Sequence, residues 1–243
     1  MENFFIFKGV KIHYLSFGSG ETTLFLHGWE GSIDSFLFVA NEINGHKILI
    51  DLPPFGQSED LIEVWTLYDY IACVKSLLEK LNVSKYNIVA HSFGGRIALI
   101  LATSTNVNKM VLTGCAGIKD KSLKLKCKVF KHKIKKRLHK FKLISSKKME
   151  NAGSSDYIKL DNTMKQTFNN IINLDLRKTL KYVDCEVLLI WGAKDNATPL
   201  KDAKLMNKKL KNSGLYVFDN GSHFAYIEYG KSFIDAVKLF FKV

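Results

Sequence analysis

Apolar and polar positions along this chain follow two patterns, short buried runs and longer stretches with helical spacing. Runs of about four to eight apolar or alternating residues predict strands, and apolar residues three or four apart predict helices. Strands are predicted at 4–7, 10–17, 23–26, 47–50, 87–90, 109–112, 186–191 and 215–218, and helices at 33–43, 66–81, 94–102, 199–211 and 230–242. The first two strands flank Lys8-Gly9 and predict a β-hairpin.

Strand and helix alternate without interruption from residue 23 to residue 115, and the alternation resumes at residue 186. This pattern predicts a parallel sheet that is covered by helices on both faces. The strand pattern is absent in between, where the sequence is polar, basic and helical in its periodicity. We therefore predict an α/β core formed by residues 1–116 and 181–243, with a helical, Lys-rich insert over residues 117–180.

The positive charge of the chain is concentrated in this insert. The chain carries a formal net charge of +13, and residues 119–148 hold 14 Lys or Arg against one acid, Asp120. Apolar residues at 123, 127, 130, 134, 138 and 141 predict an amphipathic helix with a strongly cationic face. The lysines either face solvent or attract an anionic substrate or an anionic membrane surface. Nucleic acid is not expected as a partner, because no aromatic platform accompanies the charge.

The cysteines and the N-terminal residues indicate in which cellular compartment the protein is expected. Cys73, Cys115, Cys127 and Cys185 lie far apart in the sequence, as expected for free thiols rather than a disulfide framework. The first apolar run, over residues 4–7, is too short for the core of a signal peptide, and no run is long enough to span a membrane. These features predict a cytoplasmic protein.

The sequence NIVAHSFGGRIA, residues 87–98, predicts a buried strand, a sharp turn with Ser92 at its tip, and an apolar helix. So tight a turn requires small residues around the serine, and Ala90 and Gly94 satisfy this requirement. A strained turn of this kind, a nucleophile elbow, exposes the hydroxyl and aims the first N–H groups of the helix at it. The alternative is that Ser92 only caps the helix.

Three further loops at predicted strand ends carry reactive residues. A serine hydroxyl needs a neighbouring imidazole to accept its proton, and His223 is the candidate base. Asp195 is the candidate acid that orients this imidazole, with Asp219 as the rival, and the order Ser–Asp–His matches an elbow serine. The backbone N–H groups of Trp29 and Phe93 are candidates for the oxyanion hole.

The remaining candidates concern the substrate pocket and metal binding. We expect His27, Gly28 and Tyr226 to line the pocket, with His27 and His91 in structural roles rather than as bases. No C-x-x-C or H-x-H spacing is present, so neither a metal site nor a cofactor is predicted.

The motifs HGWEG, DLPPFGQS, AHSFGG, LLIWGAKDNATP and NGSHFAYIE together resemble those of the α/β-hydrolase superfamily, over about residues 10–115 and 184–243. Within it, the chain is similar to small bacterial carboxylesterases and hydrolases of meta-cleavage products. The resemblance implies a mostly parallel eight-stranded sheet with an inserted helical cap, and Ser92, Asp195 and His223 as the catalytic triad. Two departures are Ala90 at the first glycine of G-x-S-x-G and Pro54 in the DLPGFG-type loop.

Three functions are compatible with these residues. The first is a serine hydrolase that cleaves a small-molecule carboxylic ester through an acyl-enzyme. The second is hydrolysis of a C–C bond in a meta-cleavage product, whose enzymes pair the triad with a cap arginine and an aromatic residue; here Arg177 and Tyr226 are the only candidates. The third is a non-catalytic binder that kept the fold, and the presence of all three triad residues argues against it. The sequence does not indicate an oligomeric state.

Overall fold

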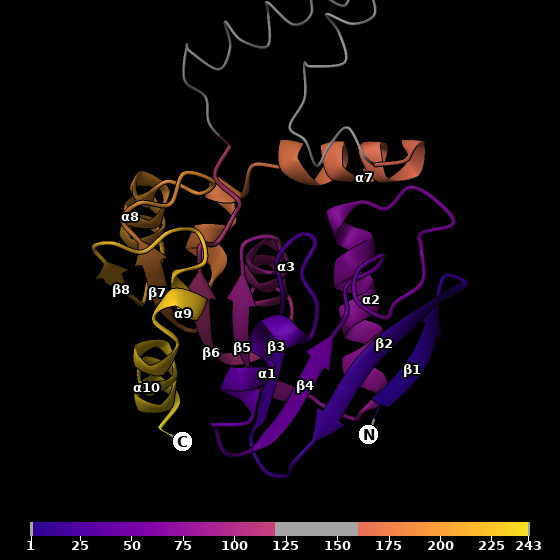
Figure 1. The fold of residues 1–243 in the computed structure, drawn as a ribbon, viewed down its shortest axis with the longest axis horizontal. Helices are drawn as coiled ribbons and strands as arrows, with labels where there is room; N and C mark the ends of the chain where they lie inside the picture. Colours follow the sequence, from indigo (N-terminus) through magenta and orange to yellow (C-terminus); the bar gives the residue numbers. More distant parts are fainter. Residues whose placement is uncertain (1, 120–159, 243) are drawn as a thin grey trace, which may run out of the picture.

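An eight-stranded sheet forms the centre of the molecule, and the computed structural model describes residues 2–119 and 160–242 (Figure 1). The strands lie in the order β1-β2-β4-β3-β5-β6-β7-β8. Their bounds are Glu2–Phe7 (β1), Val10–Phe17 (β2), Thr22–Leu26 (β3), His46–Ile50 (β4), Lys85–His91 (β5), Asn106–Thr113 (β6), Glu186–Gly192 (β7) and Ser213–Phe218 (β8). Strands β1 and β2 form the predicted hairpin, β2 is antiparallel to β4, and the other neighbours are parallel. The prediction of a mostly parallel eight-stranded sheet is confirmed.

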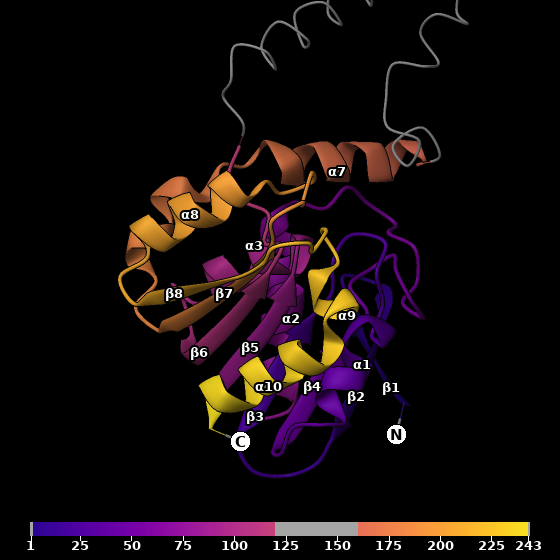
Figure 2. The ribbon, with the colours of Figure 1, turned by 60° about the vertical axis from the view of Figure 1, so that its left-hand side comes forward.

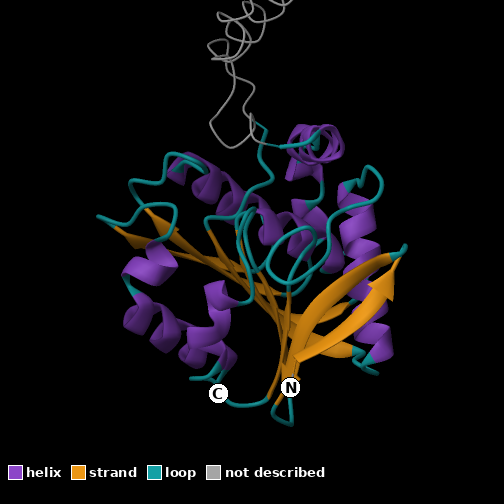
Figure 3. Ribbon diagram, turned by 45° about the vertical axis from the view of Figure 1, so that its right-hand side comes forward, coloured by secondary structure: helices purple, strands orange, loops and turns teal. Residues whose placement is uncertain are grey.

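Helices cover both faces of this sheet, as Figures 2 and 3 show. Successive residues of a strand point to opposite faces, so Leu24 and Leu26 of β3 join one apolar core while Phe25 joins the other. The first core is completed by α2 (Leu67–Lys80), α3 (Phe93–Leu101) and α8 (Leu200–Lys209), and the second by α1 (Asp34–Ala40), α9 (Ala225–Glu228) and α10 (Gly230–Phe241). Because all these elements attach to one sheet, the loops at its carboxyl edge have a rigid support.

Most predicted helices are present, with differences at their ends. The helix predicted over 33–43 spans only Asp34–Ala40, and Ile43 beyond it is buried without being helical. Helix α9 and the 3₁₀ turns at Leu176–Lys178 and Leu180–Tyr182 were not predicted. Elements of three or four residues are too short to show a helical period, which explains why the pattern missed them.

One further helix, α7 (Asn162–Asn173), comes from the predicted insert and lies across the carboxyl ends of the strands (Figure 1). The Asp161 side chain caps it by accepting a hydrogen bond from the Met164 N–H at 2.7 Å. The Thr167 hydroxyl accepts a hydrogen bond from the Trp65 N–H at 3.0 Å, which fixes the helix to the core. The cationic helix predicted within residues 119–148 lies, apart from Lys119, outside the described residues.

No helix within residues 2–119 and 160–242 combines the length and the apolar character that crossing a bilayer requires.

Candidate active site

Ser92 occupies the turn between β5 and α3, as the sequence predicts. Its backbone has φ 48° and ψ −108°, a combination that a residue with a side chain adopts only under strain. Gly94 makes the turn possible, because a Cβ atom there would lie 2.2 Å from the Leu26 carbonyl oxygen. The Gly94 N–H also donates to the His27 carbonyl at 3.1 Å. The helix therefore starts against the end of β3, and the serine projects from the turn.

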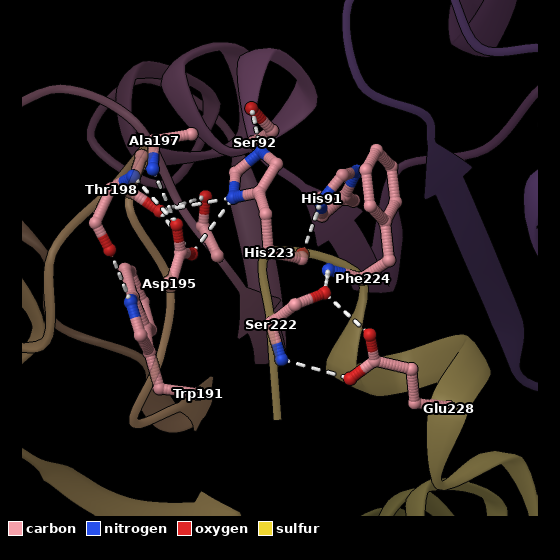
Figure 4. A network of polar contacts seen from close by, with 11 residues as sticks. His91, Ser92, Trp191, Asp195, Ala197, Thr198, Ser222, His223, Phe224 and Glu228 are labelled. Carbon is pink, nitrogen blue, oxygen red and sulfur yellow. Dashed lines mark hydrogen bonds and ion pairs between the residues drawn. The ribbon is translucent and has the colours of Figure 1, made fainter. Parts of the chain in front are cut away.

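His223 lies on the loop between β8 and α9, and its imidazole lies between Ser92 and Asp195 (Figure 4). Its Nε2 atom is 3.0 Å from Ser92 Oγ, and its Nδ1 atom is 2.8 Å from Asp195 Oδ2. The predicted residues Ser92, Asp195 and His223 thus form one continuous hydrogen-bonded chain. The rival acid, Asp219, is exposed, and the carboxylate beside the imidazole is that of Asp195.

Two contacts hold the loop that carries His223. The His91 Nε2–H donates to the His223 carbonyl at 3.0 Å, and burial together with the nearby His223 lowers the pKa of His91 to about 3, so His91 is neutral. On the other side, the Glu228 carboxylate accepts hydrogen bonds from the Ser222 N–H and hydroxyl, which lower the pKa of Glu228. Figure 4 shows both contacts flanking the imidazole. Together they fix the backbone on either side of the base.

Asp195 is buried and is surrounded by donors. Its Oδ1 atom accepts from the N–H groups of Ala197 and Thr198, both at 2.8 Å, and its Oδ2 atom lies 2.7 Å from Thr198 Oγ1. Burial alone would raise the pKa of Asp195, but the hydrogen bonds from His223 and Thr198 outweigh it and lower the pKa below its usual value. The carboxylate is therefore charged at neutral pH and is suited to hold an imidazole that becomes cationic.

Trp29 and Phe93, the residues predicted to supply the oxyanion donors, both line the cavity in front of Ser92. Their rings are in edge contact, with centroids 5.6 Å apart. Gly28 lets this loop approach the serine closely, because a Cβ atom on it would lie 3.4 Å from Ser92 Cβ and only 2.7 Å from His91 Nδ1. The loop after β3 and the start of α3 thus meet beside the hydroxyl.

The cavity has a volume of about 700 Å³ and is bounded by the core below and by α7 above. Ser92 and His223 lie in its wall. Besides Trp29 and Phe93, its lining includes apolar residues from the insert and from α9 and the loop before it: Phe168, Ile171, Ile172, Phe224 and Ile227. A cavity of this size accommodates a small organic molecule next to the serine hydroxyl.

Of the three residues expected to line the pocket, the structure places two in the lining of the cavity. Gly28 and Tyr226 line the cavity, but His27 is not among its lining residues in the described part of the chain. His27 is buried behind the loop, where its Nε2 accepts from the Leu52 N–H at 2.8 Å and its Nδ1–H donates to the Gly28 carbonyl at 2.7 Å. Burial lowers its pKa, so His27 is a neutral residue that shapes the loop and does not line the pocket.

Sequence reasoning missed three contributions to this site. These are Thr198 beside Asp195, the contact of His91 with the His223 carbonyl, and Arg96 in the wall of the cavity. The spacing of Arg96, four residues after the elbow serine, could have placed it one helical turn from the hydroxyl. The other two depend on loop conformation, for which the pattern gives no signal.

Within the described ranges, no three His, Cys, Asp or Glu side chains are grouped so as to hold a metal ion. Cys73 and Cys115 are buried free thiols, and burial raises the pKa of each. Both are therefore protonated and unreactive at neutral pH.

Two family models match the chain, and together they span most of the core. The first, described as alpha/beta hydrolase fold, matches residues 23–126, and the second, described as TAP-like protein, matches residues 173–242. The chain belongs to the α/β-hydrolase superfamily. The eight-stranded sheet and its strand order fit this assignment, and the resemblance drawn from the sequence motifs is confirmed.

Relatives of this α/β hydrolase are known in bacteria. The AB hydrolase superfamily protein YisY of Bacillus subtilis is 26% identical over 87% of this chain and 88% of its own length. A 2-hydroxy-6-oxononadienedioate/2-hydroxy-6-oxononatrienedioate hydrolase of Pseudomonas putida is 27% identical over 92% of this chain and 89% of its own. An esterase from Exiguobacterium antarcticum superposes with a TM-score of 0.78 over all of both chains, at 20% identity. The prediction of a hydrolase is confirmed at the level of the superfamily.

Proposed function

We propose that this α/β hydrolase cleaves carboxylic esters of small molecules through an acyl-enzyme, with Ser92 as nucleophile, His223 as general base and Asp195 as the orienting acid. One observation carries the proposal. Ser92 Oγ is 3.0 Å from His223 Nε2, and His223 Nδ1 is 2.8 Å from Asp195 Oδ2, in the wall of a cavity of about 700 Å³. A serine that only caps a helix requires neither an imidazole nor a buried carboxylate in line with its hydroxyl.

In the first half of the reaction, Ser92 Oγ attacks the carbonyl carbon of the ester while His223 Nε2 takes the hydroxyl proton. The carbonyl π electrons move to oxygen, and the N–H groups of Trp29 and Phe93 donate to this oxyanion. Collapse of the tetrahedral intermediate breaks the ester C–O bond, and His223 returns the proton to the departing alcohol. Asp195 stabilises the imidazolium throughout, because its carboxylate stays charged.

In the second half, a water molecule replaces the alcohol. His223 Nε2 accepts a proton from this water as its oxygen attacks the acyl carbon, and the same two N–H groups hold the second oxyanion. Breaking the bond between the acyl carbon and Ser92 Oγ releases the carboxylic acid, and the proton on His223 returns to the serine. The enzyme is regenerated with no net change in its charge.

The division of the chain follows from the same proposal. Residues 1–116 and 181–243 form the catalytic core, and residues 117–180 form a cap over the serine. Helix α7 supports this division, because Phe168, Ile171 and Ile172 line the cavity from above. An apolar roof excludes water from the acyl-enzyme until the alcohol has left.

The second candidate is hydrolysis of a C–C bond in a meta-cleavage product, and the relative from Pseudomonas putida favours it. The expected cap arginine argues in the other direction. Arg177 donates from Nε to both carboxylate oxygens of Asp175, at 2.9 and 3.0 Å, and is not among the described residues that line the cavity. For this reason we favour hydrolysis of an ester over hydrolysis of a C–C bond.

Labelling with a fluorophosphonate probe tests the proposal directly. We expect the wild type and Ser104→Ala to be labelled and Ser92→Ala to be unlabelled, since Ser104 is exposed at the far end of α3. Ser92→Ala should also lose ester turnover by several orders of magnitude without unfolding. Labelling of Ser92→Ala equal to that of the wild type would overturn the mechanism, and a wild type that is neither labelled nor active would indicate the non-catalytic binder. Parallel assays with a 4-nitrophenyl ester and a ring-fission dienoate separate the first two functions.

Two further predictions concern the surroundings of the enzyme. We place it in the cytoplasm, because buried free thiols such as Cys73 and Cys115 are typical of reducing compartments. Weak association of residues 119–148 with an anionic membrane or substrate rests on their charge alone. Sedimentation with anionic vesicles at low and high salt tests it, and binding that does not respond to salt would contradict an electrostatic attraction.

A further inference from the structure

Arg96 places a buried cation in the wall of the proposed catalytic cavity. It lies on α3 four residues after Ser92, a rise of about 6 Å along the helix axis. Its relative exposure is 6%, and it lines the same cavity as Ser92 and His223. A charged side chain is rarely buried unless a partner of opposite charge offsets the loss of hydration.

The described residues compensate this cation in part, by one hydrogen bond and by the more distant charge of Asp175. Arg96 Nη1 donates to the Leu174 carbonyl, just beyond α7, at 2.8 Å, and no carboxylate of the described residues lies within 4.0 Å of it. A guanidinium has five N–H donors, so most of its donor capacity is left for other acceptors. The nearby carboxylate of Asp175 is already bound by Arg177. Burial lowers the pKa of Arg96, although the group stays protonated at neutral pH.

The chemistry of the cavity indicates what this group binds. Apart from Arg96, the lining near α7 is apolar, and the acidic residue at the cavity, Glu30, is exposed. The planar fork of a guanidinium matches a carboxylate, and two parallel N–H···O bonds in a water-poor site are among the strongest polar contacts in proteins. A carboxylate on the substrate would therefore neutralise Arg96, the one buried cation among the described residues that line the cavity.

We propose that Arg96 binds a carboxylate carried by the substrate, so that this hydrolase acts on anionic acyl compounds such as monoesters of dicarboxylic acids. The inference rests on the proposed function, because it names the substrate class of the same site. The acyl carbon lies at Ser92 and the distal carboxylate at Arg96, one helical turn away. Arg96 selects the substrate and takes no part in proton transfer.

A purely structural role for Arg96 is the alternative. Its bond to the Leu174 carbonyl joins α3, which carries the nucleophile, to the end of the helix that roofs the cavity. Loss of such a tie would affect neutral and anionic substrates alike. The charge of the substrate therefore separates the two roles.

The test compares two matched substrate series on the wild type, Arg96→Met and Lys208→Met. One series consists of mono-4-nitrophenyl esters of glutaric, adipic and pimelic acids, and the other of neutral esters in which an isopropyl group replaces the distal carboxylate. We expect the wild type to prefer the anionic ester of at least one length by about 10- to 100-fold in kcat/KM. In Arg96→Met this preference disappears while turnover of the neutral ester persists. Lys208→Met keeps the preference, because Lys208 is exposed on α8 and is not among the described residues that line the cavity.

The outcomes distinguish failure of this inference from failure of the proposed function. Turnover of the neutral series without any anionic preference in the wild type overturns the role of Arg96 and leaves the esterase standing. An equal loss on both series in Arg96→Met assigns the residue to structure and also overturns it. If Arg96→Met does not fold, the wild-type comparison and inhibition by adipate against 6-methylheptanoate decide the question. Absence of turnover of every ester, together with absence of fluorophosphonate labelling, is a failure of the proposed function itself.

Discussion

The main-chain carbonyl of His223 accepts a hydrogen bond at 3.0 Å from Nε2 of His91, the residue that directly precedes the elbow serine. The nucleophile and the base are therefore joined twice, once through their side chains and once through this contact. The His91 ring packs against that of His223, with centroids 4.7 Å apart, and its Nδ1 atom faces Gly28 of the neighbouring loop. His91, at the end of β5, thus connects three parts of the proposed site: the turn with Ser92, the loop that carries His223 and the loop that carries Gly28.

Replacement of His91 by phenylalanine tests this link. His91→Phe keeps a ring against His223 and Tyr226 but removes the N–H donor, leaving the His223 carbonyl without this partner. We expect kcat for a 4-nitrophenyl ester to fall by about 10- to 100-fold, since displacement of a base by about 1 Å has effects of this size. His46→Phe, a substitution at the start of β4, serves as control and should keep its activity. An unchanged kcat in His91→Phe would show that the loop carrying His223 keeps its position without this hydrogen bond.

Thr198 contributes one of the hydrogen bonds that lower the pKa of Asp195. Thr198→Val removes the hydroxyl at nearly constant shape, and we expect the free energy of unfolding at pH 7 to fall by about 1–2 kcal/mol. A group whose pKa is lowered on folding stabilises the protein above its unfolded pKa, and this stability is lost as pH falls through the folded value. The difference between wild type and variant should therefore shrink below the usual pKa of 3.8.

Urea unfolding at pH 7 and pH 3 measures that difference for Thr198→Val. Thr198→Ser keeps a hydroxyl beside the carboxylate and should behave like the wild type at both pH values. A gap between Thr198→Val and the wild type that is equal at both pH values would mean that the hydroxyl acts through packing or through its hydrogen bond to the Gly114 carbonyl at 3.0 Å. In that case the carboxylate of Asp195 does not depend on it.

The strained backbone of Ser92 predicts a stability difference between two inactive variants. Ser92→Ala keeps a Cβ atom at φ 48°, whereas Ser92→Gly removes it and with it the steric conflict. Relief of strain outweighs the greater flexibility of glycine in the unfolded chain, so Ser92→Gly should be more stable than Ser92→Ala by about 1 kcal/mol. Thermal melts of the two variants give the comparison. Equal melting temperatures would indicate that the elbow relaxes when the hydroxyl is lost.

The sequence was informative wherever function depends on the order of elements. Alternation of strand and helix predicted the sheet, and the position of Ser92 after a buried strand predicted the turn, because both depend on neighbouring residues. Asp195 and His223 could be proposed only because parallel strands end at one edge. The fold of one loop places the carboxylate of Asp195, and not that of Asp219, beside His223. His27 was misplaced because adjacency in sequence to Gly28 does not determine which way its ring points.

The two glycines that follow Phe93 are restricted by different kinds of neighbour, one by backbone and the other mainly by a side chain. A Cβ atom on Gly94 would meet backbone, with the Leu26 carbonyl oxygen at 2.2 Å and the His27 carbonyl oxygen at 2.7 Å. A Cβ atom on Gly95 would meet mainly a side chain, with Cys115 Sγ at 2.4 Å and Cβ at 3.0 Å. Each single alanine variant should be destabilised, by about 3 kcal/mol for Gly94→Ala, because neither neighbour can move without cost.

A second substitution separates the two glycines. Cys115→Ala removes the Sγ atom, so the double variant Gly95→Ala/Cys115→Ala should recover part of the stability lost in Gly95→Ala. The same Cys115→Ala change should give no recovery in Gly94→Ala, because the obstacle there is the end of β3. Chemical denaturation of the five variants, including Cys115→Ala alone, measures the coupling. Equal coupling in both pairs would mean that the helix start moves as a unit and that Gly94 does not by itself set the approach of α3 to β3.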